Sequence, residues 1–295
     1  MATLVSNTTV FNKHDYVQKM RARLGKPVNW RDVMNVVFSN VRTIVTGSLT
    51  TEPAPQTDTP GDQYTYQAHV TAQDTLTLST HRVLPSFIEE PYRHEQSYLS
   101  QMEMADRHAE IISEYLEAQM LAQHASWTDF GTTDLSNTGD DSTVQITVSA
   151  TNIDDLIRAV KRKQNANNGV DLAVKFGRYF IWRSSDMEFL EAFVQANGYT
   201  EADIALKNGI AVERAFRYMG CDHYLSTQHT ALHLMAGIKK TATLGILRGT
   251  WGQIKTIEDP DRTSGLGLPS RVDYGWDFHA TTSLYKEFFM DINVV

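Results

Sequence analysis

Apolar residues spaced alternately three and four positions apart predict one long amphipathic helix over residues 89–127. Pro91 suits a first helical turn, where its missing N–H leaves no hydrogen bond unmade, and Glu103 precedes Arg107 by four residues, the stabilising order. At about 1.5 Å per residue the stretch makes a rod of roughly 50 Å, so other elements are expected to pack along it. The repeating apolar positions are Tyr98, Met102, Ala105, Ala109, Ile112, Leu116 and Met120.

Two shorter helical patterns come first in the chain. The first covers residues 11–24, where Gly25 and Pro27 end it. The second covers residues 30–45, after Asn29 as a cap. Residues 1–49 are therefore expected to form a modest helical arm.

Alternating side chains predict a β-hairpin just before the long helix. Residues 50–63 carry three prolines and no hydrophobic period, which is typical of an exposed linker. Residues 64–71 and 75–83 then alternate as two strands, joined by a turn at 72–74. Because an isolated hairpin is marginally stable in water, it needs a partner in this chain or in a neighbouring one.

The second half of the chain alternates between strand and helix patterns. Residues 143–226 are predicted to form a compact α/β module, and residues 227–295 are β-prone and should close a sheet against the long helix. The module's expected elements are a strand through Val144, Ile146 and Val148, a helix capped by Asn152, a strand over residues 172–182, a helix with Ser185 and Glu188 as its capping box, and a strand over residues 210–220.

Composition narrows the function classes. Hydrophobic residues make up 41% of the 295 positions, enough for a substantial core, and the net charge of −8 argues against a nucleic-acid-binding surface as the main function. Cys221 is the one cysteine, so no disulfide within the chain is expected. We expect no signal peptide and no membrane span, because the N-terminus lacks a basic-then-apolar pattern and no apolar run approaches eighteen residues.

Cys221, His223, His229 and His233 are the one set of residues that invites a metal hypothesis. A His pair spaced four apart binds a metal from a helix, yet the stretch around Gly237 is β-prone, so packed or surface histidines are the more common outcome. His94 and Glu95 do not extend to a zinc-protease motif, and no phosphate-binding or nucleophile motif occurs. The sequence therefore predicts no catalysis and no cofactor.

The order of these elements resembles the major capsid proteins of tailed bacteriophages, which have the Hong Kong ninety-seven-type fold, shared with encapsulin shells. The resemblance rests on the arm, the hairpin, the long helix, the α/β module and the aromatic β-rich end RVDYGWDFHATTSLYKEFFMDINVV. It implies an α+β fold made of an N-terminal arm (1–49), an E-loop hairpin (50–88), a peripheral or P domain (89–142 and 227–295) and an axial or A domain (143–226). In this family the long helix is the spine of the P domain.

The resemblance also implies a function. The chain would be a viral major capsid protein of the virion, assembled in the host cytoplasm from hexamers and pentamers into an icosahedral shell around phage double-stranded DNA. Portal, scaffolding and decoration proteins would be its partners. Residues 50–88 hold no lysine, so the isopeptide crosslinking of some relatives is not expected. The alternatives are an encapsulin-type compartment shell and a metal-dependent enzyme.

Subunit contacts are expected from the hairpin and from the polar flank of the long helix. Its apolar side, through Met102, Ile112 and Leu116, should pack against the chain's own closing strands, while the polar flank should partly meet a neighbour's hairpin. The expected interface residues are Tyr64, Tyr66, His69, Leu76, Leu78, Glu103, Arg107, Glu110 and Glu114.

Overall fold

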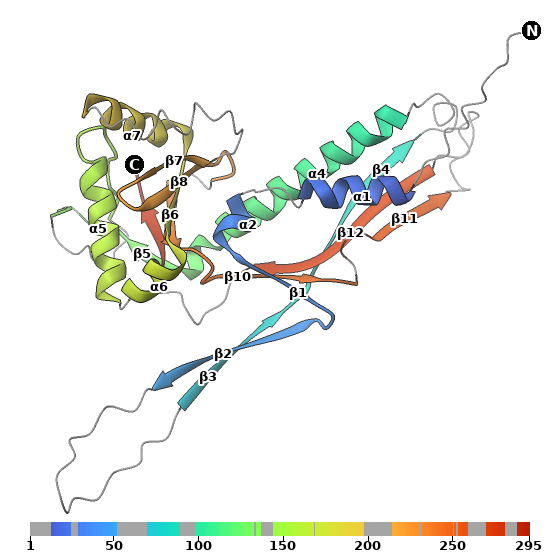
Figure 1. Cartoon of the computed structure of the whole chain (residues 1–295), viewed down its shortest axis with the longest axis horizontal. Coiled ribbons are helices and arrows are strands. Elements are labelled where there is room, and N and C mark those ends of the chain that lie inside the picture. The colour runs from blue at the N-terminus through green and yellow to red at the C-terminus, as the bar shows by residue number, and fades with distance from the viewer. Residues whose placement is uncertain are drawn as a thin grey trace, which may run out of the picture.

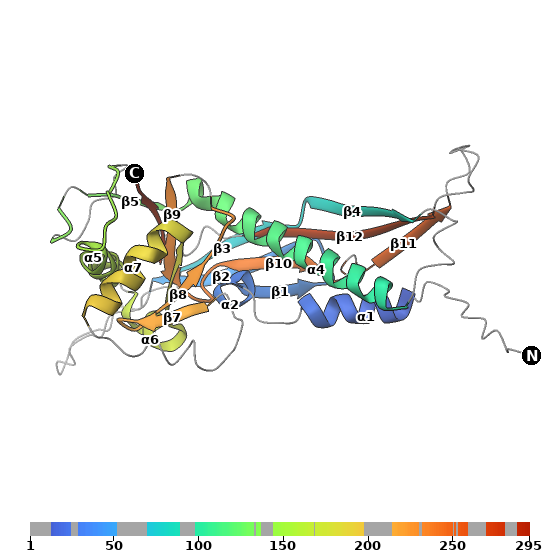
Figure 2. The same ribbon diagram turned by 90° about the horizontal axis from the view of Figure 1, so that it is seen from above.

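The computed structural model is elongated, with two sheets at different positions along a central helix (Figure 1). It describes residues 13–24, 29–51, 70–88, 98–132, 134–136, 144–167, 169–197, 214–229, 232–249, 251, 253–258, 270–280 and 288–295. Figure 2 shows helix α4 running along the long axis of the molecule. One end of the helix lies between α1 on one side and strands β4 and β12 on the other, and its opposite end reaches the six-stranded sheet. No helix in these ranges is both long enough and apolar enough to cross a bilayer.

The central helix confirms the long amphipathic pattern. Helix α4 covers Tyr98–Leu121 and continues as a short 3-10 turn, η1, over Ala122–Ser126. The predicted start at residues 89–97 lies outside the described residues. The apolar positions from Ala105 onwards are at most 1% exposed: Ala105, Ala109, Ile112, Leu116 and Met120. One stripe of the helix therefore forms core, as the spacing predicts.

A five-stranded sheet packs beneath this stripe. Its path runs from β1 (Asn35–Ser39) to β10 (Thr243–Leu247), β12 (Ser270–Ala280) and β11 (Gln253–Glu258), and β4 (Thr80–Ile88) also pairs with β12. The β1–β10 pair is parallel and the other pairs are antiparallel. Leu244 and Ile246 of β10 lie in the same core as α4, which confirms that C-terminal strands close a sheet against the long helix.

A six-stranded sheet forms the other half of the molecule. Its strand order is β5 (Thr128–Phe130), β13 (Phe289–Asn293), β9 (His233–Ile238), β6 (Arg178–Trp182), β8 (Cys221–Leu225) and β7 (Arg214–Tyr218). Helices α5 (Ile153–Ala166) and α7 (Ser184–Ala196) supply a second core against it. Strands β9 and β13 come from residues 227–295, so C-terminal residues contribute to both sheets.

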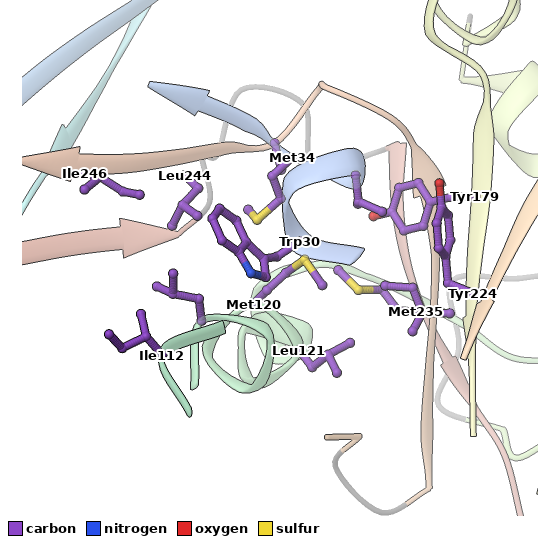
Figure 3. Close-up of a cluster of buried hydrophobic side chains, with 14 of the residues drawn as sticks. Trp30, Met34, Ile112, Met120, Leu121, Tyr179, Tyr224, Met235, Leu244 and Ile246 are labelled. Atoms are coloured by element: carbon purple, nitrogen blue, oxygen red, sulfur yellow. The ribbon is translucent and has the colours of Figure 1, made fainter. Parts of the chain in front are cut away.

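The core between the two sheets centres on Trp30, which is 1% exposed. Figure 3 shows its ring between Met34, Met120 and Leu244, with Tyr179, Tyr224 and Met235 beyond. The indole Nε1 donates a hydrogen bond to Ser113 Oγ of α4 at 3.0 Å, so the one polar atom of this large side chain is satisfied. Short helix α2 (Asn29–Val33) is thereby fixed to α4.

A buried ionic network ties α2 to the six-stranded sheet. Lys239, 6% exposed, follows β9, and its Nζ lies 2.8 Å from carboxylate oxygens of both Asp32 and Asp222. The Tyr224 hydroxyl donates to Asp32 and accepts from Lys239. Because a buried ammonium is stable only when paired, this network links two parts of the chain about two hundred positions apart in sequence.

The predicted helix over residues 30–45 is wrong. Helix α2 ends at Val33. The Lys240 ammonium donates hydrogen bonds to the carbonyl oxygens of Arg31 and Met34 at 2.6 and 2.9 Å, so these carbonyls do not continue the helical ladder. The residues that follow form β1 and β2 (Thr43–Thr51). Their valines, isoleucine and threonines favour strands when sheet partners are present, and β10 supplies the partner of β1.

The predicted hairpin is present in a different pairing. Strand β3 (Val70–Thr77) contains the predicted turn at 72–74, and it pairs with β2 so that the turn residues lie opposite Thr46–Ser48. The predicted second strand, residues 75–83, is divided between β3 and β4, and β4 pairs with β12. Residues 52–69 lie outside the described residues. The partner of β3 is β2, in a stretch predicted to be helix, and the predicted turn at 72–74 is wrong.

The strand predicted over residues 172–182 begins too early. Residues Val170–Phe176 form helix α6, Gly177 has a φ of +84°, and only Arg178–Trp182 is strand. Val174, in the middle of this segment, is 83% exposed. A left-handed glycine ends the helix, so the apparent alternation before it had no sheet to face.

Other local predictions are corrected as well. Arg183, not Ser185, holds the N-cap position of α7, and its guanidinium binds Asp186 at 2.6 Å. The predicted strand through Val144 to Val148 reduces to a single bridge between Ile146 and Val294. Helix α1 (Lys13–Leu24), α5 and the strand β7 confirm the remaining predicted elements.

Candidate assembly surface

The outer face of α4 carries four charged side chains predicted to contact a neighbour. Glu103, Arg107, Glu110 and Glu114 are all exposed. Arg23 of α1 binds Glu110, with Nη2 and Oε1 3.0 Å apart, and Lys19 lies 3.5 Å from Asp106. Part of this face is therefore covered by the chain's own α1, and a role in subunit contact stays a prediction.

The β2–β3 ribbon projects away from the body (Figure 1), but its base is anchored inside the chain. Leu76 and Leu78, predicted as interface residues, are 5% and 0% exposed. Both lie against Gly245 of β10: a methyl group at Gly245 would come within 2.6 Å of Leu78 Cδ2 and 3.2 Å of Leu76 Cδ2. In the single chain these two side chains fix the ribbon to the sheet. Tyr64, Tyr66 and His69 lie outside the described residues.

Exposed apolar side chains lie near this ribbon and on α4. The largest exposed fractions there are 62% for Val41, 58% for Val45, 42% for Val83 and 47% for Ile111. The sequence-based prediction of interface residues included none of these four side chains. Ile111 and Ile112 are adjacent, and adjacent residues of a helix point in different directions. Because Ile112 belongs to the buried stripe, the sequence could have predicted that Ile111 is exposed. The exposure of Val41 and Val45 could not be predicted, because that stretch was assigned to a helix.

The metal quartet proposed from sequence is not a ligand set. Burial raises the pKa of the Cys221 thiol to about 11, and a protonated thiol is a poor metal ligand. Burial also lowers the pKa of His223 to about 4. Its Nδ1 accepts a hydrogen bond from Trp182 Nε1 at 2.9 Å, and its Nε2 lies 3.2 Å from the Tyr218 carbonyl oxygen. Both ring nitrogens of His223 are therefore already engaged.

His229 and His233 do not complete such a site. Burial lowers the pKa of His229 to about 4, with a further contribution from the Arg183 cation. Within the described ranges, one group of side chains has the spacing of a metal site, and it comprises His124, His233 and Asp291. It shares only His233 with the predicted quartet, so the structure contradicts that ligand set.

Comparisons with known proteins place the fold. No protein-family model and no curated protein sequence matches the chain. Solved structures do: a chain of Mycobacterium phage Che8 has a TM-score of 0.57 at 12% identity, covering 91% of this chain and 97% of that one. The mature capsid of bacteriophage PhiM1 gives 0.59 at 11% identity, with coverages of 92% and 88%. The virus-like particle from Pyrococcus furiosus gives 0.57 at 10% identity, with coverages of 96% and 100%.

These matches span nearly the whole of both chains, so the similarity is one of complete architecture and not of a shared fragment. Because the sequence identity is only 10–12%, these matches establish the fold of the chain and not its function. The spine helix, the projecting ribbon and the two sheets thus form an α+β chain with the Hong Kong ninety-seven-type fold of phage capsid structures.

Proposed function

We propose that this chain is a viral major capsid protein that assembles with copies of itself into an icosahedral shell around double-stranded phage DNA. The observation that carries the proposal is the near-complete match, in both directions, to chains of phage capsids. An elongated subunit with a ribbon extending from its body is suited to reaching a neighbour.

The ribbon supports self-assembly on physical grounds. In the described residues the β2–β3 sheet has two strands, and a two-stranded ribbon is marginal in water. Val45 on β2 is 58% exposed. Lying across the spine helix of the next subunit would cover such side chains, and head-to-tail contacts of this kind close into rings and shells. Tyr64, Tyr66 and His69 are proposed to make the same contact further along the loop.

The proposed role is mechanical and involves no catalytic step. Cys221 and His223 of the predicted quartet are buried, and His223 packs against Phe180 and accepts a hydrogen bond from Trp182. The chain's net charge of −8 would let DNA be packed without adhering to the wall. We further propose hexamers and pentamers in the virion, assembly in the host cytoplasm, and portal, scaffolding and decoration proteins as partners.

Assembly of the purified chain tests the proposal. The full chain, alone and with its candidate scaffolding protein, is imaged by electron microscopy and sized by sedimentation; closed shells are expected. A variant with Val45→Asp should keep its melting temperature and lose shell yield. The matched control is Val174→Asp, at a more exposed valine on α6, 83% against 58% for Val45. A chain that stays monomeric under every assembly condition would refute the proposal.

An encapsulin-type compartment is the second candidate. The virus-like particle from Pyrococcus furiosus is matched over 100% of its chain and 96% of this one, as completely as the phage structures. The contents of the shell distinguish the two functions. Particles recovered from the native source should hold nuclease-protected double-stranded DNA if the chain is a capsid protein, and a protein cargo without DNA if it encloses a compartment.

A further inference from the structure

A cluster of two histidines and one aspartate joins the end of the spine helix to the six-stranded sheet. His124 comes from η1, His233 begins β9 and Asp291 lies in β13. His124 Nδ1 is 3.1 Å from Asp291 Oδ2, and His233 Nδ1 is 2.9 Å from both carboxylate oxygens. The imidazole rings are stacked with centroids 4.0 Å apart. Both rings therefore direct a nitrogen at one carboxylate.

The alternation of β13 explains how a carboxylate reaches this position. Met290 and Ile292 face the core formed with α5 and α7, whereas Phe289 faces the core formed with α4. Asp291 shares the face of Phe289, because side chains two apart along a strand point the same way. It is 2% exposed. A carboxylate buried this deeply requires a strong partner.

Two further polar side chains surround the cluster. Asn293, 8% exposed, is the register partner of His233, and its Nδ2 finds no hydrogen-bond partner among the described residues. Asp129 of β5 is the register partner of Asp291 in a parallel pair, so both carboxylates share one face of the sheet. Asp129 thus adds negative charge beside the cluster, which favours a cation at this place, whereas Asn293 Nδ2 is a hydrogen-bond donor and cannot ligate one.

We propose that His124, His233 and Asp291 bind a divalent transition-metal ion such as Zn²⁺. One potential ligand atom from each residue lies within 4.8 Å of the other two. Bonds of about 2.0–2.1 Å to a tetrahedral ion place ligand atoms about 3.3 Å apart. The observed distances of 2.9 and 3.1 Å need to open by only a few tenths of an ångström. Two imidazoles and one carboxylate favour zinc or iron over calcium and magnesium.

Binding requires no change of fold. Each Nδ1–H donates a hydrogen bond to the Asp291 carboxylate, which can only accept; when the ion binds, that proton moves to Nε2 or to water, and the freed lone pair binds the metal. The histidine side chains are 21% and 27% exposed, so solvent and ions have a route to the site. Because its ligands come from η1, β9 and β13, the bound ion would clamp the spine helix to the six-stranded sheet.

Metal titration of the full chain tests this site. Zn²⁺ is added to metal-free protein and followed by calorimetry, with Co²⁺ absorption reporting the ligand geometry. We expect one ion per chain at these ligands and a higher melting temperature with the ion bound. His124→Gln and His233→Gln should each weaken binding by more than about tenfold. The control, His81→Gln, changes an exposed histidine of β4 and should bind as the wild type does.

The histidine variants test metal binding without unfolding the chain. His124 lies in a partly exposed 3-10 turn, so its substitution should leave the chain folded, whereas Asp291→Asn could disturb the sheet. If His124→Gln and His233→Gln both bind Zn²⁺ with the wild-type affinity and stoichiometry, or if the wild type binds none, the proposal is overturned. The proposal is independent of shell formation, because a chain that assembles and binds no metal would contradict only this inference.

Discussion

Charge reversal on α4 separates a subunit contact from a contact within the chain. Glu110→Lys removes the ion pair with Arg23, whose atoms are 3.0 Å apart, and sets two cations against each other. Glu114→Lys makes the same change one turn further along the exposed face. The two side chains of the ion pair are 38% and 54% exposed, so water screens them, and such pairs contribute about 0.2–1 kcal/mol.

The expected loss of stability is correspondingly small. Turning attraction into repulsion at most doubles the effect of the pair, to roughly 2 kcal/mol for Glu110→Lys, and Glu114→Lys should remain within about 0.5 kcal/mol. Since 1 kcal/mol shifts the melting temperature of a large domain by roughly 2–4 °C, Glu110→Lys should lower it by a few degrees. The double variant Arg23→Glu with Glu110→Lys should restore the stability.

The yield of assembled shells distinguishes a subunit contact on α4 from a contact made only within the chain. If the outer face of α4 meets a neighbour, both single variants lose shell yield in sedimentation, and the double variant recovers melting temperature without recovering yield. Differential scanning fluorimetry of the unassembled chain supplies the stability. Full yield from Glu114→Lys, together with recovery of the double variant in both assays, would show that this face serves only to dock α1.

Three further variants probe the packing. Leu78→Ala should cost about 2–5 kcal/mol of unfolding free energy in urea, and Gly245→Ala should be less destabilising in this background than in the wild type, because its methyl group then meets Ile44 and Leu76 but no longer Leu78; equal effects of Gly245→Ala in both backgrounds would contradict this packing. Lys239→Met should cost on the order of 3 kcal/mol, since Asp222 loses its buried cation, and the double variant Lys239→Met with Asp222→Asn should lose less; an equal loss in both variants would argue against the network. Burial lowers the pKa of His223 from 6.5 to about 4, so only the unfolded chain takes up this proton as the pH falls from 6.5 towards 4, and stability falls over that window; His223→Gln should flatten this loss, and an unchanged slope between pH 7 and pH 5 would refute its origin in this residue.

Strongly periodic helices could be predicted from the sequence. The stripe on α4 and the acidic start and basic end of α5 are local signals, and both helices form where expected. The same local reasoning failed where a distant strand decides the outcome. Residues 35–39 are strand because β10, some two hundred positions later, pairs with them, and no local pattern reports that partner.

Prediction of the candidate sites failed for the same reason, because distant strands decide which side chains come together. Cys221, His223, His229 and His233 lie close in sequence, yet Cys221 and His223 are on a buried strand and point into packed surroundings. His124, His233 and Asp291 are separated by 109 and 58 positions, from 124 to 233 and from 233 to 291. Only the sheet register brings them together, so the sequence offered no spacing by which this cluster could be recognised.

The strand order of the two sheets has a consequence for synthesis and folding. Three early strands pair with strands that are synthesised much later: β1 with β10, β4 with β12, and β5 with β13. Among the described strands of the first half of the chain, β2 and β3 pair with each other, whereas β1, β4 and β5 need residues from beyond position 242. Such non-local pairings form slowly, since loop closure must precede them. A ribosome-bound chain lacking these residues can pair β9, β6, β8 and β7 of the six-stranded sheet, but it has none of β10, β11 and β12 of the five-stranded sheet. The base of the β2–β3 ribbon therefore gains the sheet it packs on only once synthesis is almost complete.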